Sequence, residues 1–137
     1  MRSQFDQGES RPRILVIDND QSVLGLVEAM LLMAGYEVHT ASTGIEAIER
    51  VIGSLSPDLV ISDYHMPGMN GLEVIQRIRT LVRTQLPSLV ITGSAADAFD
   101  PMYVSSSVWV LKKPFERVEL YQIVSNALDF RRSPTPP

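Results

Sequence analysis

Cysteine is absent from the sequence, and its absence excludes several kinds of chemistry. Without thiols the chain forms no disulfide framework, has no thiolate nucleophile and builds no cysteine-based zinc or iron–sulfur centre. A chain without cysteine fits a reducing compartment, so we expect a cytoplasmic location.

Long apolar runs and clustered positive charge are also missing. No run approaches the roughly 20 residues needed to cross a bilayer, and the polar stretch 1–11 lacks the apolar region of a secretory signal. We therefore expect neither export nor membrane insertion. The formal net charge is −4 and the basic residues are scattered, which argues against direct binding to nucleic-acid phosphates.

The composition that remains is typical of one globular domain. The chain has 137 residues, of which 45% are hydrophobic and 20% charged, and this is enough to bury a core without disulfides or metal. We expect a flexible N-terminal tail over residues 1–12, a folded domain over 13–130 and a C-terminal tail or linker over 131–137.

Short apolar runs alternate with amphipathic segments along this domain. The alternation is typical of a single doubly wound α/β fold, in which a parallel sheet is covered by helices on both faces. Five strands are expected, at residues 14–17, 36–41, 59–62, 89–92 and 108–111.

Apolar residues at helical spacing predict the helices between these strands. The first helix is expected to have Asp20 as its N-cap and Gly35 as its C-cap. The second is expected to open with a capping box formed by Thr43 and Glu46. The residues expected to form the apolar stripes are Val23, Val27, Met30, Leu31 and Ala34 in the first helix, Ile45, Ile48 and Ile52 in the second, Leu72, Ile75, Ile78 and Val82 in the third, and Val118, Tyr121, Val124 and Leu128 in the last. The arginines of the third helix, expected to face solvent, are Arg77, Arg79 and Arg83.

The connection over residues 93–107 does not follow the pattern. It carries Asp100 and Pro101 in its middle and three serines near its end, and proline interrupts a helix interior. We expect an atypical fourth helix here, short and beginning at Pro101 with Asp100 as its cap.

Charged residues follow three of the predicted strands. Asp18 and Asp20 follow the first, Asp63 follows the third and Lys113 follows the fifth. Open α/β sheets bind their ligands at the carboxyl ends of the strands. If these strands are parallel neighbours, the four groups converge at that edge.

This group of side chains favours phosphoryl chemistry. Neighbouring carboxylates repel one another unless a cation shares their site, and Mg²⁺ prefers such hard oxygen ligands together with phosphoryl oxygens. Asp63 can then attack phosphorus to form an aspartyl-phosphate, while Lys113 and the hydroxyl of Thr92 bind the phosphoryl oxygens. An acyl phosphate is reactive toward water, so it suits a transient signal.

Five motifs, taken in order, resemble the response-regulator receiver domain of two-component signal transduction. They are Ile14-Leu15-Val16-Ile17-Asp18-Asn19-Asp20, Pro57-Asp58-Leu59-Val60-Ile61-Ser62-Asp63, Met66-Pro67-Gly68-Met69-Asn70-Gly71, Thr92 and Lys113-Pro114-Phe115. The resemblance spans residues 13–130 and implies a flavodoxin-like sheet with strand order 2-1-3-4-5.

The resemblance also implies a function. A histidine kinase or phosphotransfer protein would donate a phosphoryl group to Asp63 with the help of Mg²⁺, and the domain would relay the signal by binding a downstream protein. It would catalyse at most its own phosphorylation and dephosphorylation, so it would not be an enzyme. The metal site implied by the resemblance consists of Asp18, Asn19, Asp63 and the backbone carbonyl of His65. Thr92 would supply the switch hydroxyl and Lys113 would pair with the phosphoryl group, with a cis peptide bond before Pro114.

Two residues and one segment depart from the family pattern. Asn19 stands where the family usually has an aspartate that contacts Mg²⁺, so we expect weaker metal binding. Val110 stands where many receivers carry a switch tyrosine or phenylalanine, and alternation along the strand points the neighbouring Trp109 to the opposite face. Together with the segment 93–107, these departures support an alternative, a degenerate receiver that acts as a phosphorylation-independent interaction module.

Two other functions fit the sequence less well. A flavin or nucleotide binder of the same fold needs glycine or hydroxyl residues after the first strand, where the acids Asp18 and Asp20 would repel phosphate. A magnesium phosphatase could use the same two acids, but such enzymes commonly need a cap or a further acidic loop, and the chain shows neither. We expect His39 to be structural or exposed, and the ring of His65 to be exposed on its loop.

Overall fold

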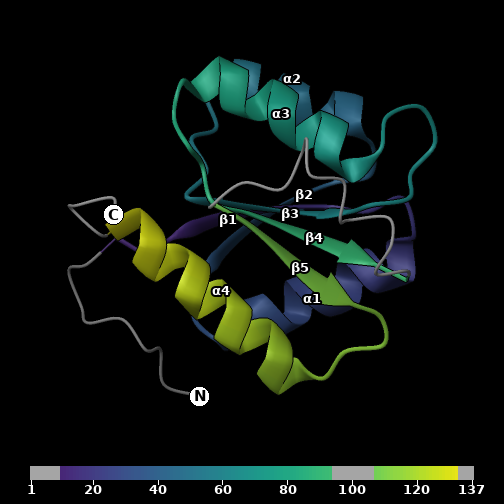
Figure 1. Ribbon diagram of the computed structural model, residues 1–137, viewed down its shortest axis with the longest axis vertical. Coiled ribbons are helices and arrows are strands. Elements are labelled where there is room, and N and C mark those ends of the chain that lie inside the picture. Colours follow the sequence, from purple (N-terminus) through teal and green to yellow (C-terminus); the bar gives the residue numbers. More distant parts are fainter. Residues whose placement is uncertain (1–9, 94–106, 133–137) are drawn as a thin grey trace.

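Five short strands form the middle layer of the structure, a computed structural model that describes residues 10–93 and 107–132 (Figure 1). The strands are β1 (Arg13–Ile17), β2 (Glu37–Ala41), β3 (Leu59–Asp63), β4 (Ser88–Thr92) and β5 (Val108–Lys112). They are hydrogen-bonded in the order β2-β1-β3-β4-β5, and every neighbouring pair is parallel. The predicted fold class and strand order are confirmed, and each predicted strand ends within one residue of the observed strand.

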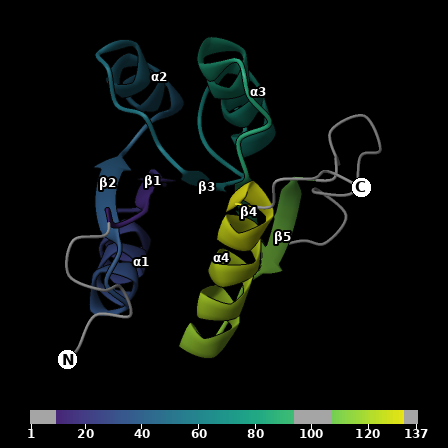
Figure 2. The same ribbon diagram turned by 90° about the vertical axis from the view of Figure 1, so that its left-hand side faces the viewer.

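Helices cover both faces of the sheet (Figures 1 and 2). The two helices on one side are α1 (Gln21–Met33) and α4 (Arg117–Arg132), and the two on the other are α2 (Gly44–Ile52) and α3 (Gly71–Val82). Because side chains alternate along a strand, Ile14 and Val16 pack with α1 and α4, whereas Leu15 and Ile17 pack with α2 and α3. The inner strands β3 and β4 are buried along their whole length, which explains their unbroken apolar runs.

Trp109 and Val110 point to opposite faces of β5, as predicted. Trp109 packs against the core beneath α1 and α4, and its ring meets that of Phe130 edge-on with the centroids 5.7 Å apart. Val110 packs against the core beneath α2 and α3. The tryptophan therefore does not replace an aromatic ring at the position of Val110.

The predicted helix caps are confirmed in part. The carboxylate of Asp20 accepts hydrogen bonds from the backbone N–H groups of Ser22 and Val23, as an N-cap does. Thr43 accepts from the N–H of Glu46, but the Glu46 carboxylate reaches back to Ser42, so this capping box is incomplete. The C-cap of α1 is Ala34, and Gly35 follows it with a positive φ of 96°.

A complete capping box occurs at a place where we did not predict one. The side chain of Asn70 accepts from the N–H of Glu73, and the Glu73 carboxylate accepts from the N–H of Asn70, both at 3.0 Å. This box begins α3 and fixes the helix directly after the loop that follows Asp63.

The face that α2 turns to the core differs from the prediction. Its buried residues are Gly44, Ala47 and Val51. Ile45 is 64% exposed and Ile52 is 68% exposed, and of the three predicted core residues only Ile48 packs against the core. A Cβ built on Gly44 would lie only 2.5 Å from Cγ2 of Val74. Helix α2 thus approaches α3 through its small residues, and the bulkier isoleucines remain outside.

Arg79 was predicted to lie on a solvated face, and this prediction is wrong. Its guanidinium group is half-buried and donates hydrogen bonds to the carbonyl of Leu86 and to both the carbonyl and the hydroxyl of Ser107. Burial lowers the pKa of Arg79 from its usual value. The side chain therefore ties the end of α3 to the start of β4 and to the residue before β5.

The predicted short helix at Pro101, with its cap at Asp100, lies outside the described residues. Within the parts of the chain that are described, every helix is too short or too polar to cross a lipid bilayer.

Replacing Gly44 by alanine tests the packing between α2 and α3. The added methyl group would clash with Val74, which is fully buried and cannot yield easily, so we expect the variant to lose about 1–3 kcal/mol of stability. Gly25→Ala is the matched control, because a Cβ at this helical position meets nothing within 4 Å. Chemical denaturation measures both variants, and equal stabilities would contradict the packing described here.

Candidate functional site

The predicted site residues lie along one edge of the sheet. Asp18 follows β1, Asp63 is the last residue of β3, Thr92 is the last of β4, and Lys113 comes just after β5. These four strands are consecutive in the sheet and parallel, so their carboxyl ends lie side by side. The fold therefore brings residues from four separate parts of the chain to the same edge.

Asp63 and Lys113 form a direct ion pair. The Nζ atom of Lys113 lies 2.9 Å from Oδ1 of Asp63. The side chain of Asp63 is 9% exposed and that of Lys113 is 33% exposed, so the carboxylate is the more buried partner of the pair. The peptide bond between Lys113 and Pro114 is cis, which confirms the prediction.

Asp18 is a second buried carboxyl group close to the first. It is 3% exposed, and its Oδ1 accepts a hydrogen bond from the backbone N–H of Asp20 at 2.9 Å. Burial raises the pKa of Asp18, and the negative charge of Asp63 raises it further, while the Asp20 N–H and Lys113 act in the opposite direction. The site thus concentrates more negative charge than Lys113 alone offsets.

Asn19 and Asp20, the next two residues on the loop, are both exposed, unlike Asp18. The hydroxyl of Ser22 donates to the Asp20 carboxylate and, with the backbone N–H groups of Val23 and Ser22, lowers the pKa of Asp20. Of the four charged groups expected to converge, Asp20 is thus the one engaged in capping α1. Asn19 lies next to Asp18 on the same loop.

The backbone around Asp63 is fixed by contacts that sequence reasoning did not assign. The hydroxyl of Ser62 donates to the carbonyl of Asp63 at 3.0 Å, and the N–H of Gly71 donates to the carbonyl of Tyr64 at 2.9 Å. A Cβ on Gly71 would lie 2.5 Å from the Asp63 carbonyl oxygen, so only glycine allows this close approach. In the sequence, Gly71 stands eight residues after Asp63 and suggested only a turn, so its close contact with the Asp63 carbonyl was not predicted.

The strand ends are also joined to one another by main-chain hydrogen bonds. The N–H of Tyr64 donates to the carbonyl of Ile91, and the N–H of Lys113 donates to the carbonyl of Thr92, both at 2.8 Å. Thr92 is completely buried. The residues after β3 and β5 are thus both tied to the end of β4, which lies between them.

The donor atoms at this edge fit a magnesium ion. Mg²⁺ binds hard oxygen ligands, usually one or two carboxylates, and keeps several waters. Asp18 and Asp63 supply two carboxylates whose mutual repulsion a cation would relieve; burial is the main cause of the raised pKa of Asp18, and the charge of Asp63 adds to it. Within the described residues there is no cluster of three or more His, Cys, Asp or Glu side chains that could hold a metal ion.

The two histidine side chains have different surroundings. The Nε2 atom of His39 lies 2.8 Å from the Glu37 carboxylate on β2, and Glu37 also contacts Arg13 at 3.0 Å. The ring of His65 is exposed and meets that of Tyr64 edge-on, with the centroids 5.0 Å apart. Both arrangements match the expectation that the histidines are structural or exposed.

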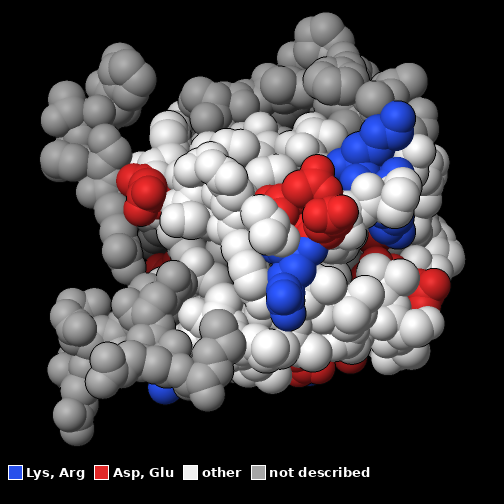
Figure 3. Space-filling view, turned by 90° about the horizontal axis from the view of Figure 1, so that it is seen from below, with Lys and Arg blue, Asp and Glu red and all other residues white. Residues whose placement is uncertain are grey.

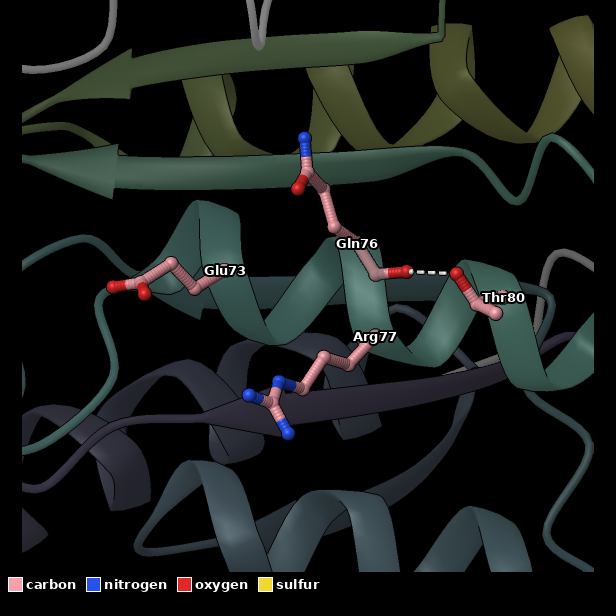
Figure 4. A pocket seen from close by; sticks show the side chains of 4 residues that line it. All are labelled: Glu73, Gln76, Arg77 and Thr80. Carbon is pink, nitrogen blue, oxygen red and sulfur yellow. Dashed lines mark hydrogen bonds between the residues drawn. The ribbon is translucent and has the colours of Figure 1, made fainter.

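Two hollows in the surface lie near these elements. One, of about 330 Å³, is lined by Glu73, Gln76, Arg77 and Thr80, and Figure 4 shows these side chains of α3 fanning apart rather than converging. The other, of about 390 Å³, is mostly apolar and lined by Val23, Leu26, Lys113, Pro114 and Phe115. The second hollow shares Lys113 with the acidic site, whereas the first has no group in common with it.

The fold and the acidic edge define an α/β signalling domain of the receiver class. A family model described as the response regulator receiver domain matches residues 14–125. The chain therefore belongs to the response regulator receiver domain family, as the sequence motifs suggested.

Individual relatives agree with this assignment. YrkP of Bacillus subtilis, an uncharacterized transcriptional regulatory protein, is 37% identical over 109 residues, which are 80% of this chain and 46% of that protein. The transcriptional regulatory protein PrrA of Mycobacterium leprae is 35% identical over 132 residues, or 96% of this chain and 55% of that protein. This chain thus spans about half the length of these two relatives.

The fold also matches solved receiver structures. The crystal structure of a response regulator receiver protein from Sinorhizobium medicae superposes with a TM-score of 0.80 at 27% sequence identity. The superposition covers 88% of this chain and 97% of that one.

Proposed function

We propose that this protein is a phosphoacceptor in a two-component phosphorelay, in which Asp63 receives a phosphoryl group from a histidine kinase or a phosphotransfer protein. The observation that carries the proposal is the ion pair between Asp63 and Lys113 beside the buried carboxyl group of Asp18. An isolated structural ion pair would not need a second buried acid next to it. A site that holds a divalent cation beside the phosphoryl acceptor would use it as a ligand.

The proposed reaction transfers a phosphoryl group from a nitrogen or oxygen atom of the donor to a carboxylate oxygen of Asp63. A carboxylate oxygen of Asp63 attacks the phosphorus atom, and the bond between phosphorus and the donor's nitrogen or oxygen breaks. The donor leaves with the electrons of that bond, and Asp63 becomes an aspartyl-phosphate. Hydrolysis of this acyl phosphate by water later returns the carboxylate and inorganic phosphate.

Lys113 and Thr92 are proposed to hold the transferred group. Lys113 now donates to Oδ1 of Asp63, so only a small shift of its ammonium group is needed to reach an oxygen of a phosphoryl group attached there. Thr92 ends the strand adjacent to β3, and its hydroxyl is proposed to donate to a second phosphoryl oxygen. Both groups stabilise negative charge without taking part in the covalent step.

Magnesium would supply the remaining positive charge, reducing the repulsion between the carboxylates and the incoming phosphoryl group. The residues proposed to hold it are Asp18, Asn19, Asp63 and the backbone carbonyl of His65. Asp18 is buried on the β1–α1 loop and the charge of Asp63 contributes to its raised pKa, whereas the Asp20 carboxylate caps α1.

Partners, location and boundaries complete the proposal. Receiver domains are signalling domains rather than enzymes in the ordinary sense, and the two relatives above are named as transcriptional regulatory proteins. We propose that the receiver comprises residues 13–130, works in the cytoplasm and relays its signal by binding an effector protein or domain. The degenerate, phosphorylation-independent receiver is less favoured because the ion pair between Asp63 and Lys113 is in place.

Incubation with Mg²⁺ and acetyl phosphate tests the phosphoacceptor role. We expect intact-mass spectrometry to detect one added phosphoryl group, formed as acetate leaves. Asp63→Asn should lose the adduct entirely, since an amide is a poor nucleophile. Asp129→Asn, which removes an exposed carboxylate from α4, is the matched control and should be phosphorylated like the wild type. No adduct at any magnesium concentration would favour the degenerate module instead.

Asn19→Asp tests the metal site separately. Replacing a neutral amide with a carboxylate beside Asp18 adds a charged ligand, so phosphorylation should reach half its maximal rate at a magnesium concentration lower by about tenfold, the change that roughly 1.4 kcal/mol produces. Asn126→Asp makes the same charge change at an exposed position on α4 and should leave the requirement unchanged. Equal magnesium titrations for Asn19→Asp and the wild type would exclude a role for residue 19 in binding the metal.

A further inference from the structure

Asn70 differs from the other asparagines of the chain in the residue that follows it. The sequence contains three asparagines, and Asn70 precedes Gly71 whereas Asn19 and Asn126 precede residues that have a side chain. The side-chain amide of an asparagine can react with the backbone nitrogen of the next residue, and a side chain on that residue obstructs the approach. Glycine presents no such obstacle. The sequence alone therefore makes Asn70 the most reactive of the three.

The reaction in question is deamidation, and it needs only water as a co-reactant. The backbone nitrogen of Gly71 loses its proton and attacks Cγ of Asn70. The bond from Cγ to the side-chain nitrogen breaks, and ammonia leaves with the proton that was lost. Water then opens the cyclic succinimide at either of its carbonyls. One opening gives aspartate, and the other gives isoaspartate, in which the main chain runs through the side-chain carbon atom.

The structure holds both reacting groups of this pair. The side-chain oxygen of Asn70 accepts from the N–H of Glu73, and the Glu73 carboxylate accepts from the N–H of Asn70, both at 3.0 Å. The N–H of Gly71 donates to the carbonyl of Tyr64 at 2.9 Å, and a carbonyl oxygen does not remove this proton. The ring can close only after the ψ angle of Asn70, which is 170°, has turned. The start of α3 must therefore open before Asn70 reacts.

We propose that Asn70 is a site of spontaneous deamidation whose rate is set by its capping box with Glu73. A reaction that needs local opening proceeds in proportion to the fraction of molecules that are open. Asn70 is half-buried and Glu73 is exposed, so water reaches this loop and the hydrogen bonds of the box hold it closed. The conversion requires neither magnesium nor phosphorylation of Asp63.

The two products affect the fold differently. Aspartate is as good an N-cap as asparagine, so α3 keeps its cap after conversion to aspartate. Isoaspartate instead lengthens the main chain by a carbon atom directly before Gly71. A Cβ on Gly71 would lie 2.5 Å from the Asp63 carbonyl oxygen, so the main chain has little spare room at this point. Isoaspartate at position 70 therefore strains the contact between the start of α3 and the end of β3.

The other two asparagines serve as internal controls. Asn19 is exposed on the β1–α1 loop. Asn126 is exposed within α4, on the side of the molecule seen in Figure 3, whereas α3 lies on the opposite side of the sheet (Figure 1). Both are more exposed than the half-buried Asn70. A faster reaction at Asn70 would therefore reflect the glycine that follows it and not its access to water.

Prolonged incubation of the full chain under native conditions tests the proposal. Peptide mapping by mass spectrometry detects, at each asparagine, the mass gained when an amide becomes an acid. In the wild type, position 70 should convert faster than positions 19 and 126. Glu73→Ala should convert position 70 about fivefold faster than the wild type, the factor that one hydrogen bond is worth. Glu73→Gln keeps an acceptor for the N–H of Asn70 and should convert at the wild-type rate.

Thermal unfolding measures the consequence for the fold. The isoaspartate form, separated by chromatography, should have a lower Tm than the unmodified protein. Freshly prepared Asn70→Asp should not, because it keeps the N-cap and the normal main chain. An isoaspartate form with an unchanged Tm would contradict the strain described for Gly71.

Thr43→Ala is the control for a general loss of helix capping. Thr43 accepts from the N–H of Glu46 at 3.0 Å at the start of α2, so this variant loses a comparable cap in another helix. Its conversion rate at position 70 should stay within about twofold of the wild type, since distant sites act independently. The proposal would be overturned if Glu73→Ala converted at the wild-type rate or Thr43→Ala accelerated the reaction as much as Glu73→Ala. Faster conversion at position 19 or 126 in the wild type would overturn it equally.

Discussion

The close approach of two buried carboxyl groups, Asp18 and Asp63, is the constraint on which the site depends. Burial disfavours the charged form of a carboxyl group, and a like charge nearby disfavours it further. Both effects act on Asp18, whose pKa is raised. Lys113 supplies one positive charge to Asp63, and within residues 10–93 and 107–132 no ion pair of Asp18 is seen. This imbalance is the physical reason that we propose a divalent cation at the site, whose charge would also offset that of a phosphoryl group on Asp63.

The parallel sheet creates this constraint and also supports it. Because all five strands run in one direction, every strand end delivers its next residue to the same edge. The strand ends are then joined through β4, where Ile91 accepts from Tyr64 and Thr92 accepts from Lys113. A change in the position of Thr92 would therefore move the main chain that carries Lys113.

The strands, their order and the residues at their ends could be predicted from the sequence, because a strand covered on both faces needs an unbroken apolar run. Helix faces were less predictable. Ile45 and Ile52 were predicted to be buried, yet α2 packs through Gly44, and the contact with Val74 depends on the position of α3, which local periodicity does not encode. The prediction that Arg79 faces solvent failed for a similar reason, because its hydrogen-bond partners Leu86 and Ser107 lie outside its own helix. The Asn70–Glu73 box could have been found from its spacing.

Chemical trapping of the phosphorylated residue tests the role of Asp63 most directly. Sodium borohydride reduces an acyl phosphate to an alcohol, so a phosphorylated aspartate becomes homoserine, and mass spectrometry of the peptides shows its position. After reaction with Mg²⁺ and a phosphodonor, we predict homoserine at position 63 and at no other acidic residue. Homoserine at position 18 or 20 instead, or none at all, would contradict the assignment of Asp63 as the phosphoryl acceptor.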